Sequence, residues 1–410
     1  MTHPSLKQVV SGACHKREIH RAGWIILDSM NIIQNGYLEI ENGWIKGVYT
    51  GFPEGACTDH GPGVLMPPLV NAHLHLELSA LKNKIPFDKG FQSWVKRLLE
   101  ERTALGNDVL IQEAEKAILD LMTWGNLYVG EISTLGITKF LLENSGLKGI
   151  FFQEFLGTAV EKGCVQKKDG LSLSVAGHAP HTSSPDLLRA LKHQSRSAGL
   201  PFSIHVAESD AESEFIFQKK GPWAGFLTLR GIDYKTWDIG SKTPVAYLDS
   251  MGLLDPLTLA VHLLQVSPKD MDILARSQVK ACVCPRSNHN LHGRLPDIEL
   301  MIQKGIMPAL GTDSLASCDS LDIWDEMAFI AHHYPGLDPR VLFSMATLNG
   351  AKALGLEHVT GTIAKGKRAD FIYLPMEIKT ENEIFERIIS SGVRLGNCME
   401  KYEKSHYRPK

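Results

Sequence analysis

Short apolar runs alternate with amphipathic helical patterns along most of this chain. Eight runs rich in β-branched residues end in polar residues, and several intervals carry a helical repeat, such as 111–122, 185–197, 268–276 and 319–331. Strands that alternate with helices predict a parallel sheet, and eight of them suffice for a closed barrel. The predicted strands are residues 65–76, 127–133, 149–156, 171–178, 202–208, 257–266, 279–288 and 307–313. We therefore predict the α/β fold class and a (β/α)8 TIM-type barrel.

The two ends of the chain show a different pattern. Residues before about Gly63 form strand-like stretches separated by turn signals, and residues 361–374 are typical of a turn between two further strands. Asp338 and Pro339 supply a cap and a first-turn proline for a helix that runs to about Leu354. We predict a small β-sandwich domain built from residues 1–63 and 356–410, beside a barrel of residues 64–355. The alternative is that both ends merely decorate the barrel.

Composition and charge exclude several classes of protein. A hydrophobic fraction of 43%, a charged fraction of 22% and a formal net charge of -3 are typical of a soluble globular protein. No basic block suited to a phosphate backbone is present, so nucleic acid is not an expected partner. No apolar run approaches the roughly 20 residues of a membrane helix, and no signal-peptide pattern opens the chain. We expect neither membrane insertion nor secretion.

The cysteines indicate a reducing compartment. Their number, 7, is odd and their spacing shows no disulfide framework, which predicts free thiols and a cytoplasmic location. Cys282 and Cys284 stand two positions apart on one predicted strand. They could form half of a soft metal site, but two buried thiols are the simpler interpretation.

His73 and His75 carry the strongest chemical signal. Residues two apart on a strand point to the same face, so both imidazoles project together near the carboxyl end of the first predicted barrel strand. Barrel enzymes assemble their sites at that end. Two neutral imidazoles suit a borderline divalent ion such as zinc or iron. Alone the pair is a weak signal, since such pairs also occur on solvated loops.

Three later polar residues strengthen this signal. His205 lies in the fifth predicted strand, His262 in the sixth, and Asp313 ends the eighth. Taken singly, each could be a hydrogen-bonded core residue, because buried polar groups need a partner. If the strand predictions hold, all three lie at the same end of the barrel as the histidine pair. Their convergence predicts one shared metal site.

The order of these residues resembles the amidohydrolase superfamily. The pattern His-x-His, His-x-x-Glu, His, Asp over strands one, five, six and eight is similar to its mononuclear deaminase branch. The dinuclear branches need a carboxylated lysine on strand four, and residues 171–178 contain no lysine. Residues 71–79, 91–99, 130–133, 284–288 and 311–317 also carry the resemblance. It covers nearly the whole chain and implies the same barrel with a small β domain.

The resemblance implies a metal-dependent hydrolytic deaminase that acts on a small adenine-type nucleoside. It implies one zinc or iron ion, with His73, His75, His205 and Asp313 as its ligands. In the implied chemistry Asp313 accepts a proton from the attacking water, His262 orients that water, and Glu208 carries protons to the ring and the leaving ammonia. The alternative for Glu208 is a helix-capping carboxylate.

Substrate contacts are implied less directly. The candidates are His178, Arg286, Trp94, Glu77 and Arg97, with Lys96 as a further cation for a substrate carboxylate. Four of these candidates have a structural alternative. His178 could be a loop histidine bonded to backbone, and Arg286, which ends strand seven, could form a salt bridge. Trp94 could lie on a core-facing helix, and Glu77 could brace the first loop. One departure concerns His181, because the family often carries a tyrosine after His-Ala-Pro.

Other functions remain open at this point. Guanine or pterin deamination and triazine-type chlorohydrolysis use the same ligand pattern. A catalytically inactive barrel that serves as a scaffold fits less well, since every expected ligand position is filled. A homodimer is the general default for a soluble enzyme.

Overall fold

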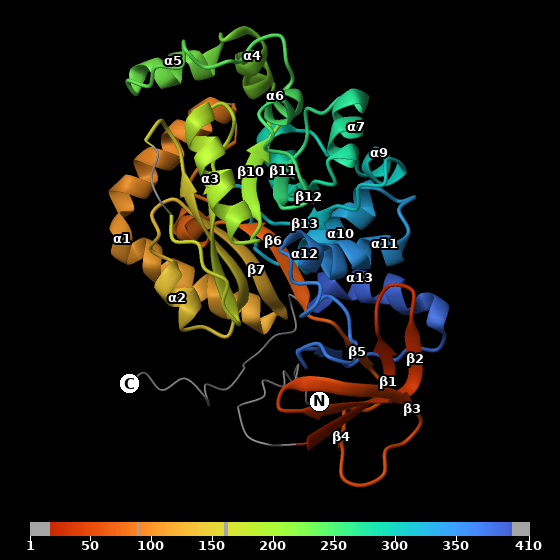
Figure 1. Ribbon diagram of the computed structural model, residues 1–410. Coiled ribbons are helices and arrows are strands. Elements are labelled where there is room, and N and C mark those ends of the chain that lie inside the picture. The colour runs from red at the N-terminus through yellow and green to blue at the C-terminus, as the bar shows by residue number, and fades with distance from the viewer. Residues whose placement is uncertain (1–16, 88–89, 160–162, 396–410) are drawn as a thin grey trace.

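Eight parallel strands form the central barrel (Figure 1). The structure is a computed structural model that describes residues 17–395, apart from 88–89 and 160–162. Neighbouring strands follow the order of the chain, and each predicted run overlaps one strand. The strands are β6 (Leu69–Leu74), β7 (Asn126–Ser133), β8 (Lys148–Phe155), β9 (Leu171–Gly177), β10 (Phe202–Val206), β11 (Thr258–His262), β12 (Lys280–Val283) and β13 (Ala309–Leu310). The predicted barrel is confirmed.

The barrel closes where β6 meets the segment after β13. The backbone N–H groups of Thr312 and Asp313 donate to the His73 carbonyl at 3.0 and 3.1 Å, and the His75 N–H donates to the Asp313 carbonyl at 3.1 Å. Gly311 permits this approach, because a Cβ there would lie 2.8 Å from the His73 carbonyl oxygen. The closure therefore places residues from the two ends of the barrel sequence side by side.

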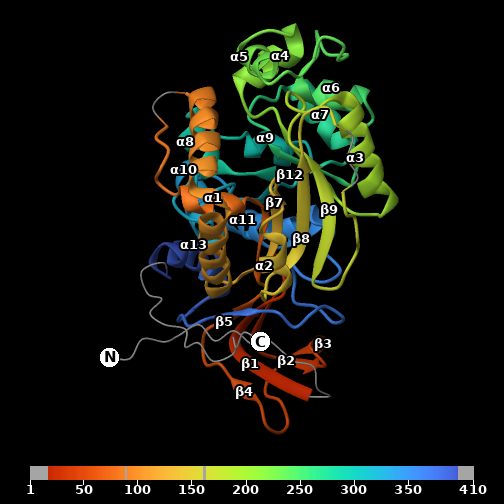
Figure 2. The same cartoon turned by 90° about the vertical axis from the view of Figure 1, so that its left-hand side faces the viewer.

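Helices cover the outside of the barrel (Figure 2). Their apolar faces pack on the strands; α3, for example, buries Leu187, Leu188 and Leu191. Within the described ranges, no helix combines the length and apolar character needed to span a membrane. The covering helices are α1 (Phe91–Thr123, kinked at Gly106), α2 (Lys139–Glu143), α3 (Pro185–Ser197), α7 (Pro268–Arg276), α8 (Pro285–His292), α9 (Ile298–Gln303), α10 (Ile323–His333), α11 (Pro339–Ala346) and α12 (Leu348–Ala353).

Capping residues set the start of α3 and of α7 at the positions that the sequence predicts. The side chains of Ser184 and Ser267 accept from the N–H groups of Leu187 and Asp270, and a proline opens each helix. A serine cap satisfies a backbone donor that a helix start leaves unpaired, and proline loses nothing at this position. Both helices therefore begin and end as predicted.

Two predictions about local structure are wrong. Arg286, predicted at the end of the seventh strand, lies in the first turn of α8, because β12 ends at Val283 and Pro285 opens a helix. The predicted helix from Asp338 to Leu354 breaks at Thr347, which has φ -129° and ψ -88° and whose hydroxyl donates to the Phe343 carbonyl at 2.7 Å. This back-bonding competes with continuation of the helix.

A separate sheet is built from both ends of the chain, as predicted. Its strands are β1 (Arg17–Ile26), β2 (Ile32–Glu41), β3 (Trp44–Thr50), β4 (Thr58–Asp59), β5 (Val64–Met66) and β14 (Ile372–Leu374). They form a single sheet in the order β14-β5-β1-β2-β3, with β4 beside β1. Only one of the two strands predicted within 361–374 is regular. Gly366, with φ 85°, turns the chain there, and only an isolated bridge joins Arg368 to Trp44.

The last described helix returns to the barrel. After η2 (Glu381–Glu383), α13 (Ile384–Leu395) places the ring of Phe385 5.0 Å from the ring of Phe343 on α11. Ile384 and Ile388 are buried in the same core cluster. This part of the C-terminal segment therefore packs against the barrel helices.

The carboxyl ends of the barrel strands carry their own cover. A short helix η1 (Leu76–Leu81) follows β6, and α4 (Asp210–Gln218), α5 (Pro222–Leu229) and α6 (Pro244–Ser250) follow β10. Both views show α4 and α5 at the opposite end of the barrel from β1–β4 (Figures 1 and 2). The histidines predicted to form a site therefore lie at the end remote from the small sheet.

We predict that Gly311→Ala lowers the free energy of unfolding by about 1–3 kcal/mol, because the new methyl group would clash with the backbone of His73. Urea unfolding measures this change. Gly225→Ala is the matched control, since no atom lies within 4 Å of the Cβ position of Gly225. Equal stability of the two variants would contradict the proposed role of close approach.

Candidate metal centre and active site

Four histidines and an aspartate meet at the carboxyl ends of the barrel strands. His73 and His75 come from the end of β6, His205 from β10, His262 from the end of β11, and Asp313 from the turn after β13. Each is less than a tenth exposed to solvent. The structure thus brings together the residues that the sequence predicts to converge.

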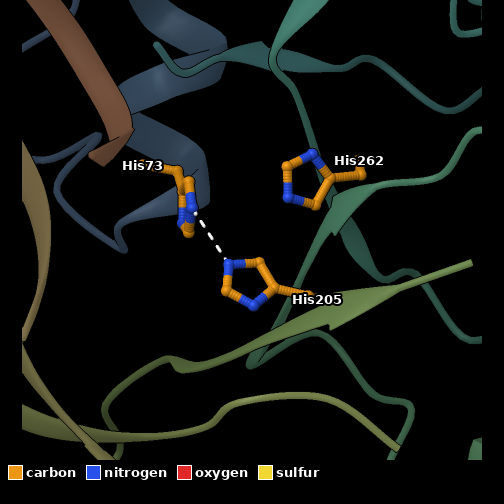
Figure 3. Close-up of side chains that lie close together, drawn as sticks. All are labelled: His73, His205 and His262. Carbon is orange, nitrogen blue, oxygen red and sulfur yellow. Dashed lines mark hydrogen bonds between the residues drawn. The ribbon is translucent and has the colours of Figure 1, made fainter. Parts of the chain in front are cut away.

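The side chains of His73, His205 and His262 point toward one another (Figure 3). Nε2 of His73 lies 3.2 Å from Nε2 of His205, and Nε2 of His75 lies 3.5 Å from Oδ1 of Asp313. Three groups of three possible ligand atoms lie within 4.8 Å of one another: His73 with His205 and His262, His73 with His75 and Asp313, and His205 with His178 and Glu154. His73 belongs to both groups that consist only of the five converging residues and is the centre of this cluster.

The electrostatics of the cluster suit a cation. Burial, followed by the charge of neighbouring histidines, holds the pKa of His73 and of His205 well below the usual value, so both rings are neutral. A hydrogen bond between Nε2 of His73 and Nε2 of His205 would leave the possible ligand atoms of the other residues in the cluster without a partner. One divalent cation satisfies neutral imidazoles and a carboxylate together. The residues therefore fit one divalent metal ion.

The backbone at two of these residues is unusual. His262 has φ 76° and Asp313 has φ 63°, in the left-handed region that residues with a side chain rarely adopt. Such conformations cost about 1–3 kcal/mol each and persist only where the surrounding structure enforces them. Here they turn the chain at the strand ends while both side chains stay in the cluster.

Helix α8 and the turn after β13 hold Asp313 and His262 in place. The hydroxyls of Ser287 and Ser317 donate to Oδ2 of Asp313 at 2.6 and 2.9 Å, which leaves Oδ1 facing the histidines. Nδ2 of Asn288 lies 3.0 Å from Nδ1 of His262. Such outer contacts orient metal-site groups and fix the histidine ring.

Glu208 stands beside the cluster as an ionised carboxylate. Its Oε1 lies 3.2 Å from Nε2 of His292 and 4.0 Å from Nε2 of His262. Burial alone would raise the pKa of Glu208, but these two histidines outweigh it and lower the pKa to about 2. Glu208 therefore carries a negative charge at neutral pH.

Glu208 does not cap the following helix. Ser209 is the N-cap of α4, and its side chain accepts from the N–H of Glu212. The buried carboxylate of Glu212 accepts from the N–H groups of Ala207 and Glu208 at 2.9 and 2.8 Å. Because Ser209 caps α4, Glu208 does not have the helix-capping role that was its structural alternative. Glu212 fixes the backbone that carries Glu208.

His178 lies next to this cluster of possible metal ligands. Its ring centroid is 5.0 Å from that of His205, and its Nδ1 lies 2.7 Å from the hydroxyl of Thr182. The alternative of a loop histidine bonded to backbone is not what the structure shows. His178 is placed where a molecule bound at the cluster would touch it.

Glu77 and Arg286 are engaged in structural contacts. The Glu77 carboxylate accepts from the N–H groups of Thr134 and Leu135 at 3.1 and 3.0 Å, and it lies 3.5 Å from Arg102. Glu77 therefore braces the loop after β7. Arg286 pairs with Asp319 and lies within 4 Å of Asp325 and Glu326, while its Nη1 donates to Ser320. Both arrangements match the structural alternatives for these residues.

Trp94 and Arg97 lie on the first part of α1. Trp94 is buried, with its ring 6.0 Å from that of Phe91 in a stacked arrangement. Arg97 is partly buried and forms no ion pair within the described part of the chain. Lys96, by contrast, is exposed and lies 3.8 Å from Glu100. Of these two cations, only Lys96 has an ion pair among the described residues.

Aromatic rings pack against one another beside the cluster. Phe91 lies 4.7 Å from His292 and 6.3 Å from Trp223, measured between ring centroids. Trp223 in turn lies 4.3 Å from His181, which lies 6.4 Å from His178. These contacts link α1, α5 and α8 to the end of β9.

Sequence reasoning missed His292, Glu212 and the bracing role of Ser287. A helical signal was available for His292, since Pro285 is a first-turn proline and Asn288 and His292 are four residues apart. On a helix such residues share a face. Recognising a helix here would have placed both beside the predicted site. Glu212 carried no such signal, because only the fold directs its carboxylate back to residue 208.

Comparison with known proteins identifies the family. A model of the amidohydrolase family matches residues 152–395, more than half of the chain. An aminodeoxyfutalosine deaminase from Deinococcus radiodurans is 32% identical over 322 residues, which cover 73% of this chain and 75% of that protein. A 5-methylthioadenosine/S-adenosylhomocysteine deaminase from Moorella thermoacetica is 28% identical over 356 residues, covering 80% of this chain and 77% of that protein.

Solved structures show the same fold. The aminofutalosine deaminase of Helicobacter pylori, in complex with methylthio-coformycin, has a TM-score of 0.79 at 24% identity and covers 91% of this chain and 96% of that one. A zinc-bound adenosine deaminase from Xanthomonas campestris has a TM-score of 0.74 at 20% identity, covering 90% and 88%. This chain belongs to the amidohydrolase family. Within that family it is an enzyme that hydrolyses C–N bonds, a deaminase.

We predict that His73→Ala loses most of the bound divalent metal, because His73 contributes to both groups of converging ligand atoms. Elemental analysis of the purified variant measures the metal content. His193→Ala, which changes an exposed histidine on α3, is the control and should keep full occupancy. Full occupancy in His73→Ala would contradict the ligand assignment.

Proposed function

We propose that this enzyme removes the 6-amino group of an adenine-type nucleoside, and that the substrate is 6-amino-6-deoxyfutalosine. Water replaces the amine, so the products are futalosine and ammonia. The observation that carries the proposal is the buried carboxylate of Glu208, 4.0 Å from Nε2 of His262, beside a buried cluster of possible metal ligands. The particular substrate is supported by the Deinococcus radiodurans relative, which bears that name.

We propose His73, His75, His205 and Asp313 as the ligands of one zinc or iron ion. When bound, such an ion supplies a Lewis acid that makes water nucleophilic at neutral pH. Imidazoles and one carboxylate suit both metals. Zinc is supported by the neighbouring adenosine deaminase structure, which contains it.

The remaining steps are proton transfers by this chain's own residues. Oδ1 of Asp313, turned toward the cluster by its two serine bonds, is placed to accept a proton from the attacking water. His262, held by Asn288, orients that water and stabilises negative charge on its oxygen. The family resemblance implies these roles, and the positions of the two side chains support them.

Glu208 transfers protons to the substrate. Addition of water at C6 of adenine leaves negative charge on the ring unless N1 is protonated. Both protons come from the attacking water. Glu208 accepts one and gives it to N1, and it then passes the other, which Asp313 had accepted, to the leaving ammonia. General acid–base help of this kind contributes roughly 10²–10⁴ in rate. Glu208 is only 8% exposed, so few water molecules can compete for these protons.

A second candidate is deamination of 5-methylthioadenosine or S-adenosylhomocysteine. Relatives with that name, and a 5'-deoxyadenosine deaminase from Methanosphaera stadtmanae, match most of the chain at 26–29% identity. All these names describe the same reaction at the purine. The candidates differ in what is attached to the sugar.

A panel of nucleosides tests the proposal. It includes 6-amino-6-deoxyfutalosine, 5-methylthioadenosine, S-adenosylhomocysteine, adenosine and guanosine, with the absorbance change from adenine to hypoxanthine as readout. The highest kcat/KM should be found with 6-amino-6-deoxyfutalosine. A clear preference for 5-methylthioadenosine would favour the second candidate. Absence of turnover with metal-loaded protein would overturn both.

We predict that Glu208→Gln keeps its metal but lowers kcat by roughly 10²–10⁴, because the amide cannot carry protons. Steady-state kinetics and elemental analysis on the same sample check the two halves of this prediction. Glu214→Gln, an exposed neighbour on α4, should behave like the wild type. Near-normal turnover in Glu208→Gln would refute the proton-transfer role.

A further inference from the structure

His181 is a buried polar side chain without a partner in the protein. It is 2% exposed, and neither its Nδ1 nor its Nε2 forms a hydrogen bond with the described residues. Leaving a buried polar group unpaired costs about as much as a lost hydrogen bond, so native structures rarely keep one without a reason. The ring also lies between His178 and Trp223, with centroid distances of 6.4 and 4.3 Å.

The loop that carries His181 is held firmly by its backbone. The N–H groups of Thr182 and Ser183 donate to the Ala179 carbonyl, both at 3.1 Å. Gly157 N–H donates to the Thr182 carbonyl at 2.8 Å, which ties the loop to the end of β8. The ring is therefore positioned by the backbone and by packing on Trp223, and its nitrogens are left for another group. Nε1 of Trp223 is likewise buried without a partner in the described structure.

The position of His181 indicates which part of a substrate it would meet. Ring contacts connect the cluster to His181 in two steps, from His205 to His178 over 5.0 Å and from His178 to His181 over 6.4 Å. The reacting purine must lie at the cluster, next to Glu208. His181 is the second ring along this path, so the part of the substrate that it would meet is the group attached to the purine, which in a nucleoside is the sugar.

The chemistry of the ring fits a hydroxyl group. Burial, followed by the charge of His178, lowers the pKa of His181 to about 3, so the imidazole is neutral and offers one N–H donor and one acceptor nitrogen. A hydroxyl both donates and accepts, so it can pair with either nitrogen. A carboxylate only accepts hydrogen bonds, so it would leave the acceptor nitrogen of this ring without a partner.

We propose that His181 hydrogen-bonds a sugar hydroxyl of the bound nucleoside and thereby selects ribosides over deoxyribosides. This inference rests on the proposed nucleoside deaminase function and adds a specificity-determining residue to it. The competing interpretation is that the ring only fills space against Trp223. A phenylalanine would fill that space equally well, so the two interpretations predict different behaviour.

The experiment compares wild type, His181→Phe and His181→Asn. Each is assayed with the best riboside of the nucleoside panel and with the 2′-deoxy and 3′-deoxy forms of the same compound, and kcat and KM are determined separately. Metal content and the melting temperature are measured on the same samples. His193→Phe, at the exposed position on α3, is the control.

We expect the wild type to prefer the riboside to at least one deoxy form. His181→Phe should lose roughly 10- to 100-fold in kcat/KM on the riboside, mainly through KM, and little on that deoxy form, as loss of one buried hydrogen bond predicts. His181→Asn should recover part of the preference. Equal losses on all substrates, or no loss, would overturn the inference while leaving the deaminase function intact. A wild type that deaminates no nucleoside would refute both.

Discussion

Burial of neutral imidazoles against one another is the constraint on which the rest of this site depends. His73 and His205 face each other at 3.2 Å inside a closed barrel, where little water can separate them. Such a group of ligand atoms is stable around a cation and unfavourable without one. The contact between β6 and the turn after β13 and the left-handed backbone of His262 and Asp313 maintain this arrangement. The unusual backbone at His262 and Asp313 lowers the stability locally but keeps the possible ligands in position.

One short helix holds much of the chemistry in position. Along α8, Ser287 bonds Asp313, Asn288 contacts His262, and His292 contacts Glu208. A rigid element with three such contacts fixes groups that come from three different strand ends. Because the three contacts share one helix, a shift of α8 would disturb metal binding and proton transfer together.

The sequence alone was sufficient for the barrel and for the converging residues, since both rest on periodic patterns and on the rule that parallel strands end at one edge. The sequence did not predict the location of Arg286, because the apolar run before it was interpreted as a strand that continued past the helix start at Pro285. The structure places that arginine on a helix and in an ion-pair network. The partners of Glu77 and the orphan nitrogens of His181 also could not be read from the chain, since they depend on loops that meet only in the folded protein. The roles assigned to individual site residues stay predictions until the variants are measured.

The aromatic rings beside the cluster belong to segments that are separate from those that carry the proposed metal ligands. Phe91 comes from α1 and Trp223 from α5, whereas the proposed ligands come from the strand ends. Replacements in these two helices would therefore change the surroundings of the cluster while the proposed ligands keep their places on the strand ends. This modular division offers a simple evolutionary route by which one ancestral deaminase could give rise to descendants that share a reaction and differ in the nucleoside they accept.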